Sequence, residues 1–174
     1  MKQFLTLNDL QNFDAQVALA KEIKANPYQY EELGKRKTLG LLFFNPSLRT
    51  RLSTQKAGRL LGMDVMVMNF SNEAWAIEYE DKTIMEGLRS EHVKEAAQVV
   101  SQYCDVVGIR AFATLTDKEK DESEQVLQKF IQYASVPILN MESATAHPLQ
   151  ALADALTLTE LSLPKKPKVV LTWA

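Results

Sequence analysis

Two short segments of the chain carry side chains that could bind and polarise an anionic molecule. The first, residues 45–51 (NPSLRTR), contains Ser47, Arg49 and Thr50. If a helix begins here, hydroxyls, guanidinium groups and free backbone N–H groups converge, which suits a phosphate dianion. The alternative is that Ser47 only caps the helix and the arginines are solvated. Because cations oppose the helix dipole at this end, a bound anion explains two arginines better.

The second segment reads HPLQALAD, with His147 at the expected cap of a helix and Gln150 one turn further on. Arg110 lies at the end of a separate apolar run. The alternative interpretations are that Arg110 is an ordinary surface arginine and that His147 only caps the helix. Taken with Arg49 and Arg110, however, His147 would complete a ring of donors for which no carboxylate base is needed.

These groups must be positioned by an alternation of strands and helices. Apolar runs of strand length recur along the chain, and between them apolar residues follow helical spacing. The expected strands are residues 38–44, 65–68, 106–109 and 136–139. This order predicts an α/β fold, a parallel sheet flanked by helices on both faces. Ligands bind beyond the carboxyl ends of such strands, so the polar groups are expected at one edge of the sheet.

The two ends of the chain carry their own signals. Thr6 and Asp9 form a capping pattern that predicts the start of a first amphipathic helix, which Pro27 would end. Residues 1–163 are expected to form one domain, and residues 164–174 a linker with the first strand of a truncated second α/β domain. The alternative is that the final strand joins the first sheet as an edge.

Composition and charge exclude several classes. The chain is 46% hydrophobic and 24% charged with a net charge of -2, so no general attraction for nucleic acid or membrane lipid is expected. Its apolar runs are far shorter than the ~20 residues of a membrane span, and its start does not resemble a signal peptide, which predicts a cytoplasmic protein. One cysteine and two histidines make a metal site improbable.

A long loop is expected over residues 69–90, and it contains Trp75 among polar neighbours. Loops of this length are usually functional or disordered. By itself, a loop tryptophan is more often a packing plug or an oligomer contact than a ligand contact.

The segment SLRTR after FFNP, with the downstream pattern HPxQxLxD, resembles the aspartate/ornithine carbamoyltransferase family. The resemblance covers essentially the whole chain and implies the carbamoyl-phosphate domain of that family. Leu48 replaces the first threonine of the usual motif. Together with Trp75 and the Thr172–Trp173 ending, it resembles the branch that carbamoylates N-acylated ornithine. For that branch, the resemblance implies a homotrimer in which Trp75 reaches the carbamoyl phosphate of a neighbouring subunit.

The resemblance also implies a role for each site residue. Ser47, Arg49 and Thr50, with the N–H groups of residues 48–50, would hold the phosphate. Arg110 and His147, aided by Thr50, would be catalytic and would stabilise the oxyanion.

Two further roles follow from the resemblance. Gln150 would bind the carbamoyl NH2 group, and Glu142 would contact the amino-acid substrate, although Glu142 could equally be a structural partner of the arginines. No cofactor and no metal are implied.

Three hypotheses about function stay open. Ser90 stands where the acyl-ornithine branch varies with the acyl group, and a small uncharged residue there favours N-succinylornithine over N-acetylornithine. An ordinary ornithine carbamoyltransferase is the second hypothesis, and Leu48 and Trp75 argue against it. The third is a non-catalytic phosphate-binding module.

Overall fold

The computed structural model describes residues 3–70, 76–81, 83–84, 89–161, 163–164, 166–170 and 172, with the backbone alone for residues 89 and 90. Its main feature is a parallel sheet with the strand order β1-β7-β6-β2-β3. The strands are β1 (Gln3–Phe4), β2 (Thr38–Phe43), β3 (Asp64–Asn69), β6 (Val106–Ala111) and β7 (Ile138–Ser143). The predicted α/β fold and the existence of the four main strands are confirmed. The predicted bounds 106–109 and 136–139 were wrong at their ends, since β6 and β7 extend far enough to include Arg110 and Glu142.

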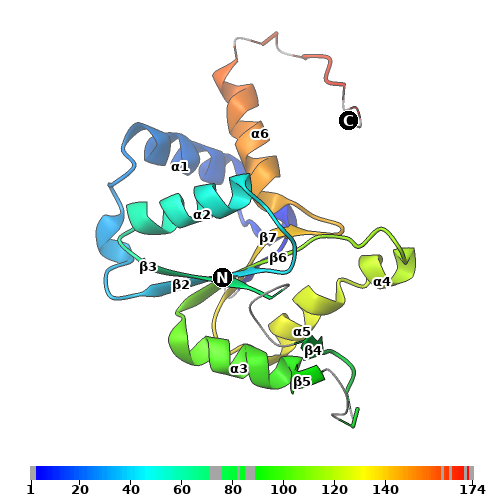
Figure 1. Ribbon diagram of the computed structural model, residues 1–174. Helices are drawn as coiled ribbons and strands as arrows, with labels where there is room; N and C mark the ends of the chain where they lie inside the picture. The colour runs from blue at the N-terminus through cyan, green and yellow to red at the C-terminus, as the bar shows by residue number, and fades with distance from the viewer. Residues whose placement is uncertain are drawn as a thin grey trace.

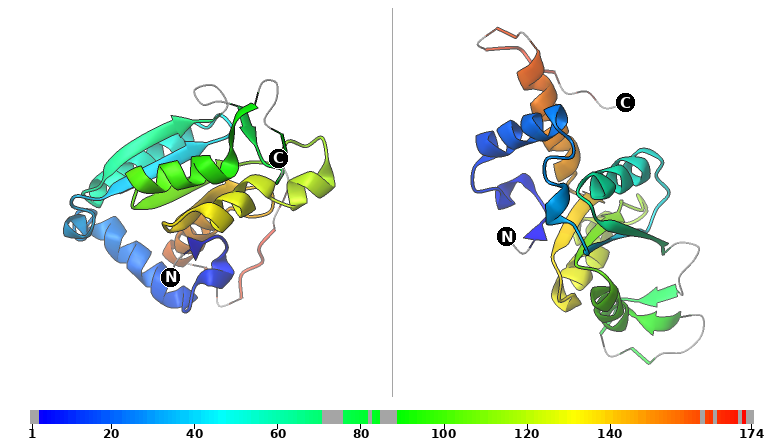
Figure 2. Two further views of the ribbon diagram at one scale, coloured as in Figure 1. Left: turned by 90° about the horizontal axis from the view of Figure 1, so that it is seen from below. Right: turned by 90° about the vertical axis from the view of Figure 1, so that its left-hand side faces the viewer.

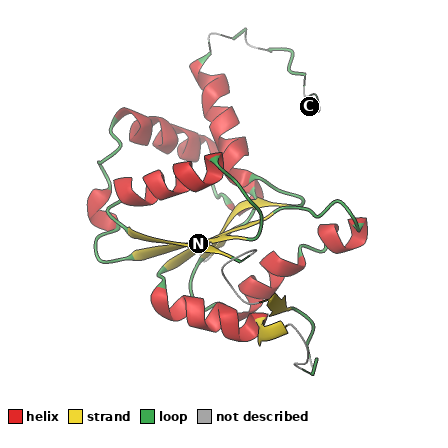
Figure 3. Cartoon of the chain, in the orientation of Figure 1, coloured by secondary structure: helices red, strands yellow, loops and turns green. Residues whose placement is uncertain are grey.

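Helices cover both faces of this sheet (Figures 1 and 3). One face carries α1 (Phe13–Ala25), α2 (Arg49–Leu60) and α6 (Pro148–Glu160). The other face carries α3 (Val93–Tyr103) and α5 (Gln125–Tyr133). The short helix α4 (Lys118–Glu122) lies between β6 and α5, and the 3-10 turns are η1 (Leu7–Asp9) and η2 (Glu31–Leu33).

Strand β2 is buried on both faces, as its unbroken apolar run predicts. Leu42 packs in the cluster beneath α3 and α5 with Val93 and Phe130. Leu41 and Phe43 point the other way and pack with Met141. Since successive side chains of a strand alternate between faces, a central strand needs apolar residues at every position.

The chain reverses its direction of travel across the sheet at β2. From β2 it moves outward through α2 to β3, and from β3 it returns through α3 to β6 on the other side of β2. The reversal places a crevice between the carboxyl ends of β2 and β6, which is where ligands bind in open α/β sheets.

A second, two-stranded parallel sheet lies apart from the first (Figure 2). It is formed by β4 (Ala76–Glu78) and β5 (Arg89–His92). The expectation of one long loop over residues 69–90 was therefore wrong in part. Trp75 lies outside the described residues, and so does the side chain of Ser90.

Asp81 fastens this small sheet to α5. Its carboxylate accepts hydrogen bonds from Lys129 Nζ at 2.7 Å and from Tyr133 Oη at 2.9 Å. Next to it, Glu80 Oε1 accepts a hydrogen bond of 2.6 Å from Gln125 Nε2. We name the contacts of Asp81 with Lys129 and Tyr133 the Asp81 clamp.

The two ends of the chain differ from expectation. The capping box of Thr6 and Asp9 exists, but it caps η1, and α1 begins separately after Asn12, whose side chain caps it. The strand expected over residues 168–174 is not formed by residues 168–170 or 172, and the other positions lie outside the described residues. A strand requires a hydrogen-bonded neighbour, and residues 168–170 and 172 have none within the part of the chain that the structure describes, so the expectation of a second domain stays a prediction. Among the described residues, no helix has the length and apolar character needed to cross a lipid bilayer.

Candidate functional site

A cavity of about 680 Å³ opens at the crevice beyond β2 and β6, between α2 and α6. It is lined by Ser47, Arg49, Thr50, Ser53, Thr54, Ala57, Arg110, Glu142, His147, Leu149, Gln150 and Ala153. The lining includes every predicted site residue except Leu48, Trp75 and Ser90. Residues from two loops, from the ends of strands β6 and β7, and from helices α2 and α6 therefore meet at the predicted edge.

The N-terminus of α2 forms one wall of this cavity. Ser47 Oγ accepts a hydrogen bond of 3.3 Å from the backbone N–H of Thr50, so Ser47 does cap the first turn. Arg49 is exposed and forms no hydrogen bond or ion pair with any described residue. The Leu48 side chain is 74% exposed and does not line the cavity. An uncompensated guanidinium beside a helix N-terminus favours an anion there.

Arg51 does not join this wall, and the expectation that both arginines converge was wrong. Its guanidinium lies over the Phe43 ring at 4.7 Å and donates a hydrogen bond to Asn69 Oδ1. Residues two apart on a helix point in nearly opposite directions, so Arg49 and Arg51 cannot face the same ligand.

Arg110 is fixed firmly, and the alternative of a surface arginine is wrong because its side chain is only 12% exposed. Its Nε donates to Glu142 Oε2 at 2.8 Å, and its Nη1 donates to the carbonyl oxygen of Pro46 at 3.1 Å. Arg110 and Glu142 are register partners on adjacent strands. Arg110 thus ties β6 to β7 and to the loop before α2, while its Nη2 makes no hydrogen bond to any described residue.

His147 occupies the cap position of α6, but its side chain does not cap the helix. Its Nε2 lies 3.8 Å from the same Glu142 oxygen that Arg110 contacts. Its Nδ1 is buried and has no hydrogen-bond partner among the described residues. The imidazole is therefore available to a ligand in the cavity. Glu142 is shown as a structural partner of Arg110, while its contact with a substrate stays a prediction.

Gln150 and two hydroxyl residues complete the polar lining. Gln150 Nε2 donates to Asp154 Oδ1 at 2.7 Å, which leaves its Oε1 without a donor among the described residues. Ser53 and Thr54 were missed by the sequence analysis, although their positions three and four residues after Thr50 place them on the same helix face. Both hydroxyls donate to the Thr50 carbonyl oxygen, at 3.2 and 2.7 Å.

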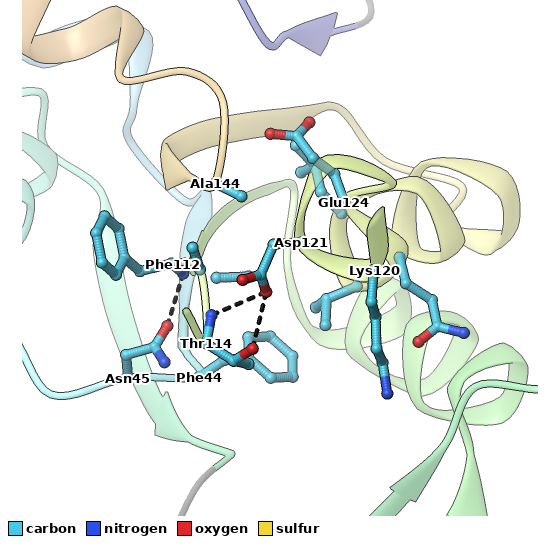
Figure 4. A pocket seen from close by; sticks show the side chains of 13 residues that line it. Phe44, Asn45, Phe112, Thr114, Lys120, Asp121, Glu124 and Ala144 are labelled. Atoms are coloured by element: carbon cyan, nitrogen blue, oxygen red, sulfur yellow. Dashed lines mark hydrogen bonds between the residues drawn. The ribbon is translucent and has the colours of Figure 1, made fainter. Parts of the chain in front are cut away.

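A smaller cavity of about 180 Å³ lies on the α5 side of the same edge and contains none of the predicted site residues (Figure 4). Asp121 organises its rim by accepting hydrogen bonds from Thr114 N at 2.9 Å and Leu115 N at 2.8 Å. These bonds, first of all that from Thr114 N, lower the pKa of the Asp121 carboxyl. Asp121 thereby fastens α4 to the loop that follows β6.

The fold and the larger cavity define an open parallel α/β domain with a polar cavity at its topological switch point. Residues 2–160 match the family model described as aspartate/ornithine carbamoyltransferase, carbamoyl-P binding domain. The chain belongs to this family.

Six of the relatives it matches are named as acylornithine carbamoyltransferases, and two more distant ones as ornithine carbamoyltransferases. The chain is 47% identical over 174 residues to N-succinylornithine carbamoyltransferase of Bacteroides thetaiotaomicron, covering 100% of this chain and 55% of the relative. It is 40% identical over 178 residues to N-acetylornithine carbamoyltransferase of Xanthomonas campestris, covering 99% of this chain and 52% of the relative. The chain thus spans about half the length of the curated relatives it matches.

A solved structure is similar as well. It is an N-acetyl-L-ornithine transcarbamylase in which serine replaces one glutamate, complexed with carbamyl phosphate and N-succinyl-L-norvaline. The TM-score is 0.85 at 40% sequence identity, and the match covers 92% of this chain and 48% of that one.

Proposed function

We propose that the protein transfers the carbamoyl group of carbamoyl phosphate to the δ-amine of N-succinylornithine, as a step of arginine biosynthesis. The observation that carries this proposal is the cavity in which Arg49, Arg110 and His147 meet at the N-terminus of α2. It offers separate donors for a phosphate and for a carbonyl oxygen. We propose no cofactor, because the reaction requires only that the phosphate is bound and that the carbonyl group is polarised, and the side chains of the cavity can do both.

The wall at α2 is proposed to hold the phosphate. Ser47, Arg49 and Thr50 supply two hydroxyls and a guanidinium beside the first turn of the helix. A dianion at this position gains from both the cation and the helix dipole.

Arg110 and His147 are proposed to act on the carbonyl group, aided by the Thr50 hydroxyl. The amine nitrogen forms a bond to the carbonyl carbon, the bond from that carbon to the phosphate oxygen breaks, inorganic phosphate leaves, and the amine gives up one proton. Negative charge builds on the carbonyl oxygen during attack, and donors placed there each contribute about 10²–10³ in rate. Gln150 Oε1, which has no donor among the described residues, is proposed to accept a hydrogen bond from the carbamoyl NH2 group.

The proposed acyl group follows from the similarity to relatives and from Ser90, with N-acetylornithine as the alternative. The chain is 47% identical to the relative named N-succinylornithine carbamoyltransferase and 40% identical to the one named N-acetylornithine carbamoyltransferase. Ser90 adds support because a small neutral side chain leaves room for the extra carboxylate of a succinyl group. The serine-for-glutamate variant crystallised with N-succinyl-L-norvaline is consistent with that reasoning.

A homotrimer in the cytoplasm completes the proposal. Trp75 would reach the carbamoyl phosphate site of a neighbouring subunit, and Glu142 would contact the amino-acid substrate. The second half of each substrate site would come from the part of the relatives that this chain does not span.

The test is citrulline-type product formation by the full-length protein with N-succinylornithine, N-acetylornithine and ornithine. We expect the highest kcat/KM with N-succinylornithine and little turnover of ornithine. A preference for N-acetylornithine would refute the acyl assignment but keep the enzyme class. If no acceptor is carbamoylated while carbamoyl phosphate and unrelated phosphates bind equally in calorimetry, the chain is a phosphate-binding module instead.

A further inference from the structure

The loop that carries His147 is anchored firmly at its base. Asn140 on β7 is only 1% exposed, and its Nδ2 donates to Ser143 Oγ at 2.9 Å and to the Leu5 carbonyl oxygen at 3.0 Å. The backbone then closes a turn through a 2.8 Å hydrogen bond from Ser143 N to the Ala146 carbonyl oxygen. These contacts fix both ends of the turn but not its tip.

The tip of the turn is held by a residue from another element. Thr145 donates twice to Glu124 Oε1, from its backbone N at 3.0 Å and from its hydroxyl at 2.7 Å. Thr145 has no other hydrogen-bond partner among the described residues. Figure 4 shows Glu124 at the start of α5, beside Ala144 of the same turn. The Glu124 carboxylate therefore links the start of α5 to the loop that leads into α6.

Glu124 makes this contact from an unusual backbone conformation. Its φ of 50° and ψ of 40° lie in the left-handed region, where side chains other than glycine are disfavoured. Such strain persists only where the surroundings impose it, and it is concentrated at functional sites. A glycine would fit this backbone better but would leave Thr145 without its acceptor.

We propose that Glu124 is a positioning residue for His147. By holding Thr145, it fixes the turn immediately before His147 and so keeps the imidazole in place over the cavity. The expected change in kcat rests on the proposed function, whereas the expected displacement of the His147 ring does not. A displacement of about 1 Å in a reacting group can cost up to about 10²-fold in rate.

The central experiment compares Glu124→Gly with Glu124→Gln in the full-length protein. Glycine relieves the backbone strain and removes the acceptor, so we expect kcat to fall at least about tenfold while KM for carbamoyl phosphate changes less than about threefold. Glutamine retains an oxygen at the same distance, so kcat is expected within about threefold of wild type. Thr145→Val, which removes the hydroxyl donor alone, should lower kcat in the same direction and serves if Glu124→Gly does not fold.

Leu115→Gly is the matched control. Leu115 also has a left-handed backbone, with φ of 63°, but it is 80% exposed, and its backbone N–H donates to Asp121 rather than to any residue of the turn before His147. Replacement by glycine relieves comparable strain, and kcat is expected to stay unchanged.

A second readout does not require turnover. The ring resonances of His147, assigned by a His147→Asn variant, should shift in Glu124→Gly and remain in place in Leu115→Gly and Glu124→Gln. A shift in a protein that fails to carbamoylate any acceptor would support the positioning role and reject the proposed function. Unmoved resonances in Glu124→Gly, an unchanged kcat in that variant, or equal losses in Glu124→Gln would each overturn the inference.

Discussion

At the start of α2, Arg49 lies in the cavity without a described ion-pair partner, whereas Arg51 packs over the Phe43 ring. The two side chains have the same chemistry, so their positions on the helix decide their roles. A guanidinium without a counter-ion, such as that of Arg49, is stabilised strongly by a bound anion. A guanidinium that already has an aromatic and a hydrogen-bonding partner, such as that of Arg51, is stabilised little.

Arg49→Ala is therefore expected to weaken carbamoyl phosphate binding strongly. Each charged hydrogen bond lost costs about 1.5–3 kcal/mol, which corresponds to about a tenfold to hundredfold rise in Kd. Arg51→Gln is the control and should change Kd by less than about threefold, because Arg51 faces the strand. Calorimetric titration of the full-length variants measures both values. Similar Kd values for Arg49→Ala and wild type would show that this wall does not hold the phosphate.

Ser90 leads to a prediction about specificity. In Ser90→Glu, the added carboxylate is expected to repel the terminal carboxylate of a succinyl chain. The ratio of kcat/KM for N-succinylornithine to that for N-acetylornithine should fall or reverse, while Ser90→Ala should leave it nearly unchanged. Steady-state kinetics on both substrates give the ratio, and an unaltered ratio in Ser90→Glu would remove Ser90 from the specificity site.

Among the elements, the small β4–β5 sheet depends on the Asp81 clamp for its attachment to α5. Hydrogen bonds from Lys129 and then Tyr133 lower the pKa of the Asp81 carboxyl. The same contact raises the pKa of Lys129. A lowered carboxyl pKa gives stability that is present above the ordinary aspartate pKa and lost as pH falls through the lowered value. A raised lysine pKa gives stability that is lost as pH rises through the raised value. The clamp should thus be at full strength from about pH 5 to about pH 9.

Asp81→Asn is expected to loosen β4 and β5 throughout that pH range without unfolding the main sheet. Faster amide hydrogen exchange in residues 76–78 and 91–92 is the measurement, with β2 as the internal reference. Asp64→Asn is the control, since the exposed Asp64 carboxylate makes no hydrogen bond or ion pair with a described residue. Equal exchange in the Asp81 and Asp64 variants would contradict the clamp.

The sequence predicted the central elements well because their signal is local. The run Leu39–Phe43 is apolar at each position other than Gly40, so a strand buried on both faces follows without any knowledge of its neighbours. The strand β5 reads Arg-Ser-Glu-His and has no apolar pattern, and β1 contains only two residues. Neither strand could be recognised by periodicity.

The site was predictable as a set of loops but not as a set of contacts. The rule for parallel sheets placed Ser47, Arg110 and His147 at one edge, and the cavity confirms that grouping. The pairing of Arg110 with Glu142 depends on the register of β6 against β7, which includes an irregularity after Ile109. Register between distant strands is set by the packed structure, so the sequence left the role of Glu142 open.

For the whole molecule, the proposed trimer makes a prediction about mixed assemblies. If Trp75 serves the site of a neighbouring subunit, Trp75→Ala and Arg110→Ala chains should each be inactive alone. Co-assembled from full-length subunits, they should recover part of the activity, because some sites then receive an intact tryptophan and an intact arginine. Mixing two differently tagged Arg110→Ala preparations is the control. If trimers shown to contain both variants recover no activity, the shared-site arrangement is wrong.

The edge strand β1 has a consequence for how the chain acquires its structure. Gln3 and Phe4 pair with Ile138 and Leu139, and Asn140 holds the carbonyl oxygen of Leu5. On the ribosome, at about 5–20 residues per second, β1 emerges well before β7 and must wait several seconds or more for this partner strand to be made. Closing so long a loop is entropically costly, so β2, β3 and β6 can associate first. Strand β1, although it is made before the other strands of this sheet, thus docks last, and until it does, the outer edge of β7 is open to pairing with another nascent chain.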